Sequence, residues 1–159
     1  MLIDSIINVI LIDTFYPLVL SDFRYGLDSL VKAVTENACN FLLGVPAMLV
    51  DLTKCIDEKQ LQLPSLEIVM AGGSMLPEKL PASLFKKVPS LKFFHQGYGL
   101  TETSTLICTN FSHDRRNLSL DYVGKPIDFV EVQLVAPQTR QTVMIGESGK
   151  RSLRGIREA

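Results

Sequence analysis

A segment near the middle of the chain combines glycines with residue types that suit a nucleotide. In residues 96–103, QGYGLTET, Tyr98 stands between two glycines and is followed by Thr101 and Glu102. Glycine lets the backbone approach a flat or charged ligand closely, and a tyrosine ring can lie on a base. The Thr101 hydroxyl and amide suit a phosphate oxygen, and the Glu102 carboxylate suits a Mg²⁺ ion that bridges to phosphate. These residues in this order predict a nucleotide site.

A second glycine-bearing segment, residues 71–74 (AGGS), also follows an apolar stretch that is typical of a buried strand. In an open parallel sheet, ligands bind beyond the carboxyl ends of the strands, so both segments are expected there. Each feature alone has an ordinary structural explanation, because paired glycines often make turns and a Thr-Glu pair often caps a helix. The combination on two consecutive strand–helix units favours a binding site.

The elements that position these segments follow from the apolar periodicity. Helical spacing of apolar residues alternates with short, nearly continuous apolar runs, which predicts an α/β fold with a parallel sheet flanked by helices. Pro77 suits the first position of its helix. The expected helices are residues 26–40, 47–58 and 77–88, and the expected strands are residues 41–46, 66–73 and 91–96. Residues 1–20 are expected to form a core helix followed by a buried strand.

The character of the sequence changes from about Ser119. Val130, Val132 and Leu134 alternate with polar residues, as in a half-exposed strand, and a weaker strand is expected at residues 143–145. We therefore predict a partial α/β subdomain over residues 1–118 and the start of a small β-rich subdomain over residues 119–159.

The motifs together resemble one family. QGYGLTETS resembles the signature loop of the adenylate-forming superfamily, which includes acyl-CoA synthetases, 4-coumarate ligases and firefly luciferase. Three further stretches, FLLGVPAMLVDL, AGGSMLPEKL and VGKPIDFVEVQLVAPQT, are similar to neighbouring segments of the same family. The resemblance runs from about Pro17 to Gly155 and is greatest to medium-chain fatty-acyl-CoA synthetases. It implies that the chain is part of the family's large N-terminal domain.

Roles for individual residues follow from the resemblance, position by position. Thr101 would contact the α-phosphate and Glu102 would hold Mg²⁺, which makes these two residues the catalytic candidates. The residues that would line the adenine, with the Tyr98 ring stacked on it, are Gly73, Ser74, Gln96, Gly97, Tyr98 and Gly99. The residues that would form part of the acyl tunnel are Gly72, Gly73, Gln96 and Leu100. His95 is expected to be a structural or pocket-edge residue.

The implied reaction activates a carboxylic acid, such as a fatty acid, with ATP to give acyl-AMP and then transfers the acyl group to coenzyme A. The family's phosphate loop, ribose-binding aspartate and C-terminal catalytic lysine have no counterpart here, so we expect an internal fragment that is inactive alone. The tail GKRSLRG also has Lys150 and Arg151 where the family has acid and leucine, which weakens the prediction of a last strand. Two alternatives stay open: a catalytically dead truncated binding or regulatory module of the same family, and an unrelated α/β nucleotide binder.

Composition and charge exclude other classes. The 159 residues are 47% hydrophobic and carry a net charge of −1, so the chain can bury a core but has no electrostatic case for binding nucleic acid. The apolar residues 1–20 contain Asp4 and Asp13, each of which would cost ~3 kcal/mol in a membrane-spanning helix. We expect no transmembrane segment. Three widely spaced cysteines indicate reduced thiols in an intracellular compartment, with cytoplasm, mitochondrion and peroxisome equally compatible. A homo-oligomer is compatible with the sequence as well.

Overall fold

The computed structural model describes residues 26–103, 106–110, 123–128, 130–144 and 149–155. A five-stranded sheet has the order β1-β2-β3-β4-β5, and β6 and β7 form a separate two-stranded sheet. The strands are β1 (Phe41–Gly44), β2 (Ile68–Ala71), β3 (Phe93–Tyr98), β4 (Cys108–Thr109), β5 (Lys125–Pro126), β6 (Val130–Val135) and β7 (Lys150–Gly155). The helices are α2 (Leu27–Glu36), α3 (Pro46–Lys59) and α4 (Leu80–Lys87), with a 3₁₀ turn, η1, at Thr101–Thr103.

The larger sheet is mixed rather than purely parallel. β1, β2 and β3 run parallel, as predicted, but β4 and β5 continue the sheet in antiparallel fashion. The physical reason is the short connection between β3 and β4. A parallel return needs a crossover of about a dozen residues or more, usually a helix, whereas a short turn brings the chain back antiparallel. The strand–helix alternation therefore predicted the first three strands only.

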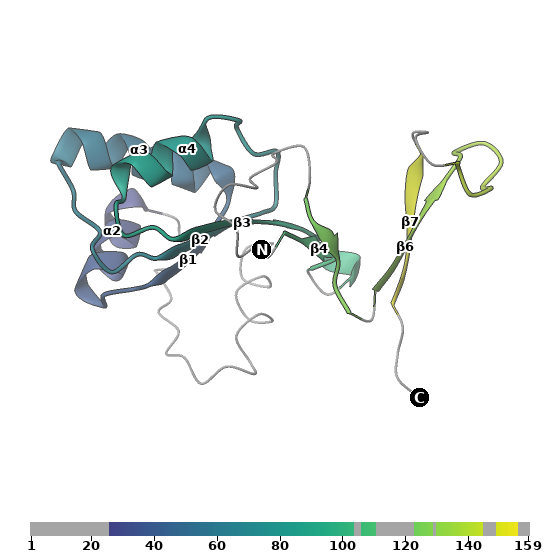
Figure 1. Ribbon diagram of the computed structural model, residues 1–159, viewed down its shortest axis with the longest axis horizontal. Helices are drawn as coiled ribbons and strands as arrows, with labels where there is room; N and C mark the ends of the chain where they lie inside the picture. Colours follow the sequence, from purple (N-terminus) through teal and green to yellow (C-terminus); the bar gives the residue numbers. More distant parts are fainter. Residues whose placement is uncertain (1–25, 104–105, 111–122, 129, 145–148, 156–159) are drawn as a thin grey trace.

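Helices α3 and α4 lie side by side over one face of the sheet (Figure 1), and they seal the core. Side chains of Leu49 and Leu52 in α3 and of Leu84 in α4 are fully buried. They pack in one cluster with alternate strand residues, Leu42, Val69, Ala71 and Phe94. Apolar burial of this kind is the main favourable term in folding. The packed core therefore fixes the positions of the strand ends from which the loops leave.

Helix α4 begins later than the sequence indicates. The helix starts at Leu80, three residues after the predicted start at Pro77, and Pro81 occupies its first turn. The Pro77 carbonyl instead accepts a hydrogen bond from the Leu80 amide at 3.0 Å, in a turn that precedes the helix. A helix from Pro77 would place Pro81 in the interior, where proline lacks an amide hydrogen and clashes with the preceding turn.

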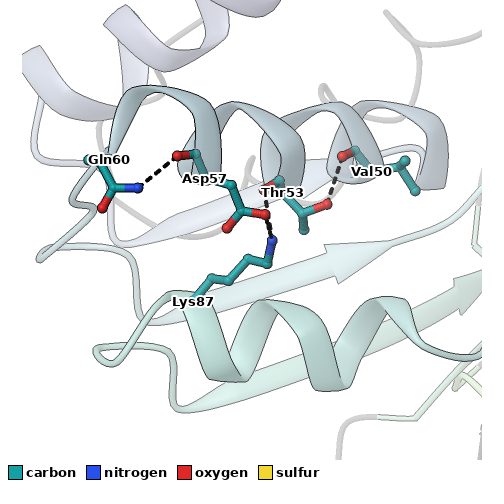
Figure 2. Close-up of polar contacts among 5 residues, drawn as sticks. All are labelled: Val50, Thr53, Asp57, Gln60 and Lys87. Carbon is teal, nitrogen blue, oxygen red and sulfur yellow. Dashed lines mark hydrogen bonds and ion pairs between the residues drawn. The ribbon is translucent and has the colours of Figure 1, made fainter.

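Lys87 ties α4 to α3, as Figure 2 shows. Its ammonium donates to the Thr53 carbonyl at 3.1 Å and forms an ion pair with Asp57. At the end of α3, the side-chain amide of Gln60 donates a hydrogen bond to the Asp57 carbonyl at 2.8 Å. Within the helix, the Thr53 hydroxyl donates to the Val50 carbonyl at 2.7 Å. The Lys87 side chain is only 20% exposed, so this contact is better shielded from water than an ordinary surface pair.

The second C-terminal strand lies at a different place in the sequence from the predicted one. β6 pairs antiparallel with β7 along its whole length, from Val130 opposite Gly155 to Val135 opposite Lys150. The last strand therefore forms although its sequence departs from the family pattern. The strand expected at residues 143–145 is wrong for Val143 and Met144, because only Thr142 makes an isolated bridge, to Val135. Ile145 lies outside the described residues, as do residues 1–25 and their expected helix and strand.

Two sequence-based expectations concern the whole chain. The thiols of Cys55 and Cys108 are buried, and that of Cys39 is partly buried. No helix within the described ranges is long and apolar enough to cross a membrane. The division after residue 118 falls in a stretch outside the description, and it stays a prediction. β5 joins the larger sheet, while β6 and β7 form their own.

Candidate functional site

The parallel register brings the two glycine-bearing segments together. The ladder between β2 and β3 ends with Ala71 opposite Gln96, so Gly72 and Gly97 follow at the same edge of the sheet. A Cβ atom on Gly72 would lie 3.1 Å from the Gly97 carbonyl oxygen. The Gly72 amide also donates to the Gly44 carbonyl at 3.3 Å, which adds the end of β1. The structure therefore places both predicted segments side by side at the strand ends.

Backbone conformation explains the glycine at position 73. Gly73 has φ of +85°, in a region that residues with a side chain rarely adopt. A Cβ there would also approach Val45 Cγ1 at 3.4 Å. Gly73 and Ser74 are both exposed at the edge of the sheet, and Met75, the next residue, is 92% exposed. The segment after β2 thus leaves main-chain and hydroxyl groups open to solvent.

The second segment is more regular than the sequence predicted. β3 continues through Gly97 and Tyr98, which pair antiparallel with Thr109 and Cys108. Gln96, Gly97 and Tyr98 are therefore strand residues rather than loop residues. A side chain at Gly97 would force its neighbours to shift, because its Cβ would lie 2.7 Å from Met70 Cε and 3.1 Å from Leu106 Cδ1. The strand pairing fixes the main chain on both sides of Tyr98.

Thr101 and Glu102 sit in the turn η1, directly after Gly99 and Leu100. Thr103 closes this turn, since its amide and its hydroxyl both donate to the Leu100 carbonyl, at 3.1 Å and 2.9 Å. Thr101 and Glu102 are exposed and Leu100 is 41% exposed. The turn presents a hydroxyl and a carboxylate to the solvent shortly after the end of β3.

Gln96 is a predicted site residue whose polar side chain is buried. Its side chain is buried, with a relative exposure of 9%, and among the described residues nothing donates a hydrogen bond to its Oε1 atom. Buried polar atoms are nearly always paired, because an unpaired one costs roughly 1–3 kcal/mol. Parallel pairing puts Gln96 in the same row as Ala71, on the face that α3 and α4 cover. An acceptor is thus held beside the two glycines, available to a donor from a ligand.

His95 lies on the other face of β3 and is buried. Its ring stacks on Phe93, with centroids 6.0 Å apart, and Nδ1 lies 3.4 Å from the Asn110 carbonyl. This environment is a structural one, in agreement with the sequence analysis.

Asn110, which sequence analysis did not single out, contacts the site directly. Its Oδ1 accepts a hydrogen bond from the Gln96 amide at 2.5 Å. Nothing in the local sequence signals this contact, because it depends on the antiparallel return of β4. No group of three or more metal-ligating side chains exists within the described residues. Glu102 supplies the carboxylate of η1, which is the kind of oxygen ligand that Mg²⁺ takes.

The chain is similar in sequence to known proteins. A family model described as AMP-binding enzyme matches residues 17–156, and the chain therefore belongs to the AMP-binding enzyme family. Acyl-CoA ligase SID4 of Ajellomyces capsulatus is 27% identical over 128 residues, which are 80% of this chain and 22% of that protein. The mitochondrial medium-chain acyl-CoA ligase ACSF2 of Danio rerio is 28% identical over 125 residues, which are 79% of this chain and 20% of that protein.

The fold also matches solved structures. The anthranilate CoA ligase AuaEII, in complex with anthranoyl-AMP, superposes with a TM-score of 0.68 at 21% identity, covering 81% of this chain and 24% of that one. The chain spans about a fifth of the length of the two relatives. Its fold matches part of the N-terminal domain of adenylate-forming enzymes.

Proposed function

We propose that this chain forms part of the nucleotide and acyl site of an ATP-dependent acid–thiol ligase. The whole protein would activate a carboxylic acid as acyl-AMP and pass the acyl group to coenzyme A. The observation that carries the proposal is the closeness of Gly72 to the Gly97 carbonyl after the ladder between Ala71 and Gln96, which brings the two predicted binding segments to one sheet edge. Membership of the AMP-binding enzyme family and the acyl-CoA ligase relatives support the same reaction class.

The base is assigned to the sheet edge where the two segments meet. Gly73 is exposed there and carries no side chain, so a planar ring can approach the main chain beside it. The Tyr98 ring would stack on the adenine, and Gly73, Ser74, Gln96 and Gly99 would line it. Gln96 Oε1, which accepts no hydrogen bond from the described part of the chain, suits a ligand group that donates one, such as an amine or a hydroxyl.

The phosphate and metal are assigned to η1. The Thr101 hydroxyl and amide would bind an α-phosphate oxygen, and the Glu102 carboxylate would hold Mg²⁺ bound to ATP. The Thr101 hydroxyl and amide would donate to the negative charge that builds up on the α-phosphate as the acyl carboxylate attacks it, and Glu102 would hold the cation that neutralises part of that charge. The carboxylate is already ionised at neutral pH, so no general base is required, and the buried, stacked His95 needs no catalytic role.

The acyl group is assigned to the wall formed by Gly72, Gly73, Gln96 and Leu100. Glycines leave space for a chain, and Leu100, 41% exposed, provides apolar contact. We propose a fatty acid as the substrate, in keeping with the medium-chain ligase relative. Coenzyme A would then accept the acyl group as the second substrate.

The reaction is tested by carboxylate-dependent exchange of pyrophosphate into ATP, measured on the full-length natural protein that carries this segment. Medium-chain fatty acids should support exchange, and Glu102→Ala should slow it by roughly a hundredfold, as is usual for a lost group that stabilises developing charge. Glu78→Ala is the matched control, since Glu78 is an exposed glutamate outside the assigned residues, and it should retain wild-type exchange.

Two results would contradict the proposal. Exchange by Glu102→Ala close to the wild-type rate would remove the metal role. Absence of exchange with any carboxylate would favour a noncatalytic binding module. The 159-residue chain alone should show no exchange, because contacts that stabilise the charge, each worth ~3 kcal/mol, are expected from segments outside it.

A further inference from the structure

Asn110 makes hydrogen bonds to both the main-chain amide and the main-chain carbonyl of Gln96. The Asn110 side-chain Oδ1 accepts from the Gln96 amide at 2.5 Å, and the Asn110 amide donates to the Gln96 carbonyl at 3.2 Å. The Thr109 hydroxyl donates to the same carbonyl at 3.2 Å. Because the amide and the carbonyl belong to the peptide planes on either side of the Gln96 Cα atom, these contacts together fix the direction of its side chain.

The asparagine side chain takes the place of a main-chain acceptor. The antiparallel ladder ends with Gly97 opposite Thr109, so Asn110 would be the next partner of Gln96. The Asn110 main-chain carbonyl instead lies 3.4 Å from His95 Nδ1. Because the Asn110 main-chain carbonyl lies near His95, the side-chain Oδ1 of Asn110 accepts the hydrogen bond from the Gln96 amide in its place.

Gly124 holds the Asn110 main chain in position from the other side. Gly124 has φ of +102°, and a Cβ on it would lie 1.9 Å from the Thr109 carbonyl carbon and 2.3 Å from the Asn110 nitrogen. The main chain before β5 is therefore seated directly on the Thr109–Asn110 peptide. β5 then pairs with β4 through Lys125 opposite Thr109. The asparagine is thus anchored by two strands, with little freedom to move relative to Gln96.

We propose that Asn110 is a positioning residue of the nucleotide and acyl site, acting through Gln96. This inference rests on the proposed function, in which Gln96 lines both the adenine and the acyl chain. Loss of the Asn110 acceptor leaves the Gln96 amide without its partner and frees the peptide to rotate. Rotation moves the buried Gln96 side chain, and it disturbs the adjoining Gly97, whose carbonyl abuts Gly72. Asn110 itself touches no ligand.

Three variants of the full-length natural protein separate the acceptor from bulk and from general stability. Asn110→Leu keeps the side-chain shape but has no acceptor, whereas Asn110→Asp keeps an acceptor oxygen. Asn37→Leu is the matched control, because Asn37 donates a hydrogen bond to the Ala33 carbonyl at 2.9 Å at the exposed end of α2, away from the strand ends. Binding of AMP is measured by calorimetry, folding by urea titration, and hydrogen–deuterium exchange on peptides that cover Gln96.

Asn110→Leu should weaken AMP binding about tenfold, the equivalent of one lost hydrogen bond of ordinary strength, and should speed exchange at Gln96. Asn110→Asp should bind AMP within about threefold of the wild type, and Asn37→Leu should bind it unchanged. If Asn110→Leu does not unfold cooperatively, Asn110→Ala replaces it, with the same expected loss.

Each contrary outcome has a distinct meaning. Wild-type affinity in Asn110→Leu, or equal losses in Asn110→Leu and Asn110→Asp, would overturn the positioning role while leaving the proposed function intact. A wild-type protein that binds no AMP would overturn the proposed function and, with it, the inference.

Discussion

Gly72 lies against the main-chain carbonyl of Gly97, so closely that a methyl group on Gly72 would come within 3.1 Å of that oxygen. The two glycines follow neighbouring parallel strands, and the parallel ladder before them ends at Ala71 and Gln96. This contact turns two separate sequence motifs into one surface. It also makes the surface sensitive to the smallest possible side chain.

Replacement of Gly72 by alanine should therefore weaken ligand binding more than it destabilises the fold. The new methyl group is tighter against Gly97 than most real contacts, so the two segments must separate by a few tenths of an ångström. We expect about a tenfold loss of AMP affinity, with a cost of about 1 kcal/mol in unfolding free energy. Calorimetry and urea unfolding measure the two effects on the full-length protein.

The control for this change is Gly26→Ala at the start of α2. A Cβ there would lie 3.4 Å from the Ser29 hydroxyl, an ordinary contact, and the position is remote in sequence from both segments. AMP affinity should be unchanged in Gly26→Ala. An equal loss of affinity in both variants would mean that Gly72 has no special part in the site.

Tyr98 is expected to bind the base through its ring and not through its hydroxyl. Tyr98→Phe keeps the ring, and its affinity for AMP should stay within about twofold of the wild type. Tyr98→Ala should lower the affinity by about tenfold to a hundredfold, as the loss of a stacking aromatic ring typically does. Fluorescence titration with a labelled AMP analogue measures both. If phenylalanine proves as damaging as alanine, the stacking assignment is wrong.

Gly124→Ala should be the most damaging of the single glycine substitutions. Its Cβ would lie 1.9 Å from both the carbon and the oxygen of the Thr109 carbonyl, and main-chain atoms cannot move aside as a flexible side chain can. Strain at positive φ adds to the cost. We expect a loss of at least about 3 kcal/mol, measured by urea unfolding. A stable Gly124→Ala protein would show that the chain before β5 does not rest on β4.

Lys87 should contribute to stability through its partly buried link between α3 and α4. Lys87→Met removes the hydrogen bond to the Thr53 carbonyl and the ion pair with Asp57, and it should cost about 1–2 kcal/mol. Lys54→Met is the control, since Lys54 pairs with Asp51 at 3.6 Å on an exposed surface and should cost less than about 0.5 kcal/mol. Equal costs in thermal or urea unfolding would contradict the difference in burial.

The elements that depend on apolar periodicity were predictable from the sequence. α2 and α3 carry a helical pattern that buries one face, and the three parallel strands are short, nearly continuous apolar runs. The order of these elements predicts a sheet covered by helices. The nearness of Gly72 and Gly97 then followed from the rule that parallel strands end at one edge. Local pattern also gave the strand β6, whose valines alternate with polar residues.

The remainder depends on contacts between distant residues. β4 consists of only two residues, Cys108 and Thr109, which is too short for a pattern of alternating residues to predict it. Without β4 the extension of β3 through Tyr98 and the contact of Asn110 with Gln96 are both invisible in the sequence. The prediction of where α4 starts was wrong for another reason. Both Pro77 and Pro81 suit the first turn of a helix, and α4 begins at Leu80, with Pro81 in its first turn. β7 forms through its pairing with β6, which its own sequence does not foretell.

The central claim is that the segments after β2 and β3 together hold an acyl-adenylate. The most direct measurement is a crystal structure of the full-length natural protein with a non-hydrolysable acyl-adenylate analogue. The account predicts the adenine ring on Tyr98 and between Gly73 and Gln96, with the phosphate at Thr101. An analogue bound at any other edge of the sheet, with Tyr98 and Gln96 untouched, would contradict it.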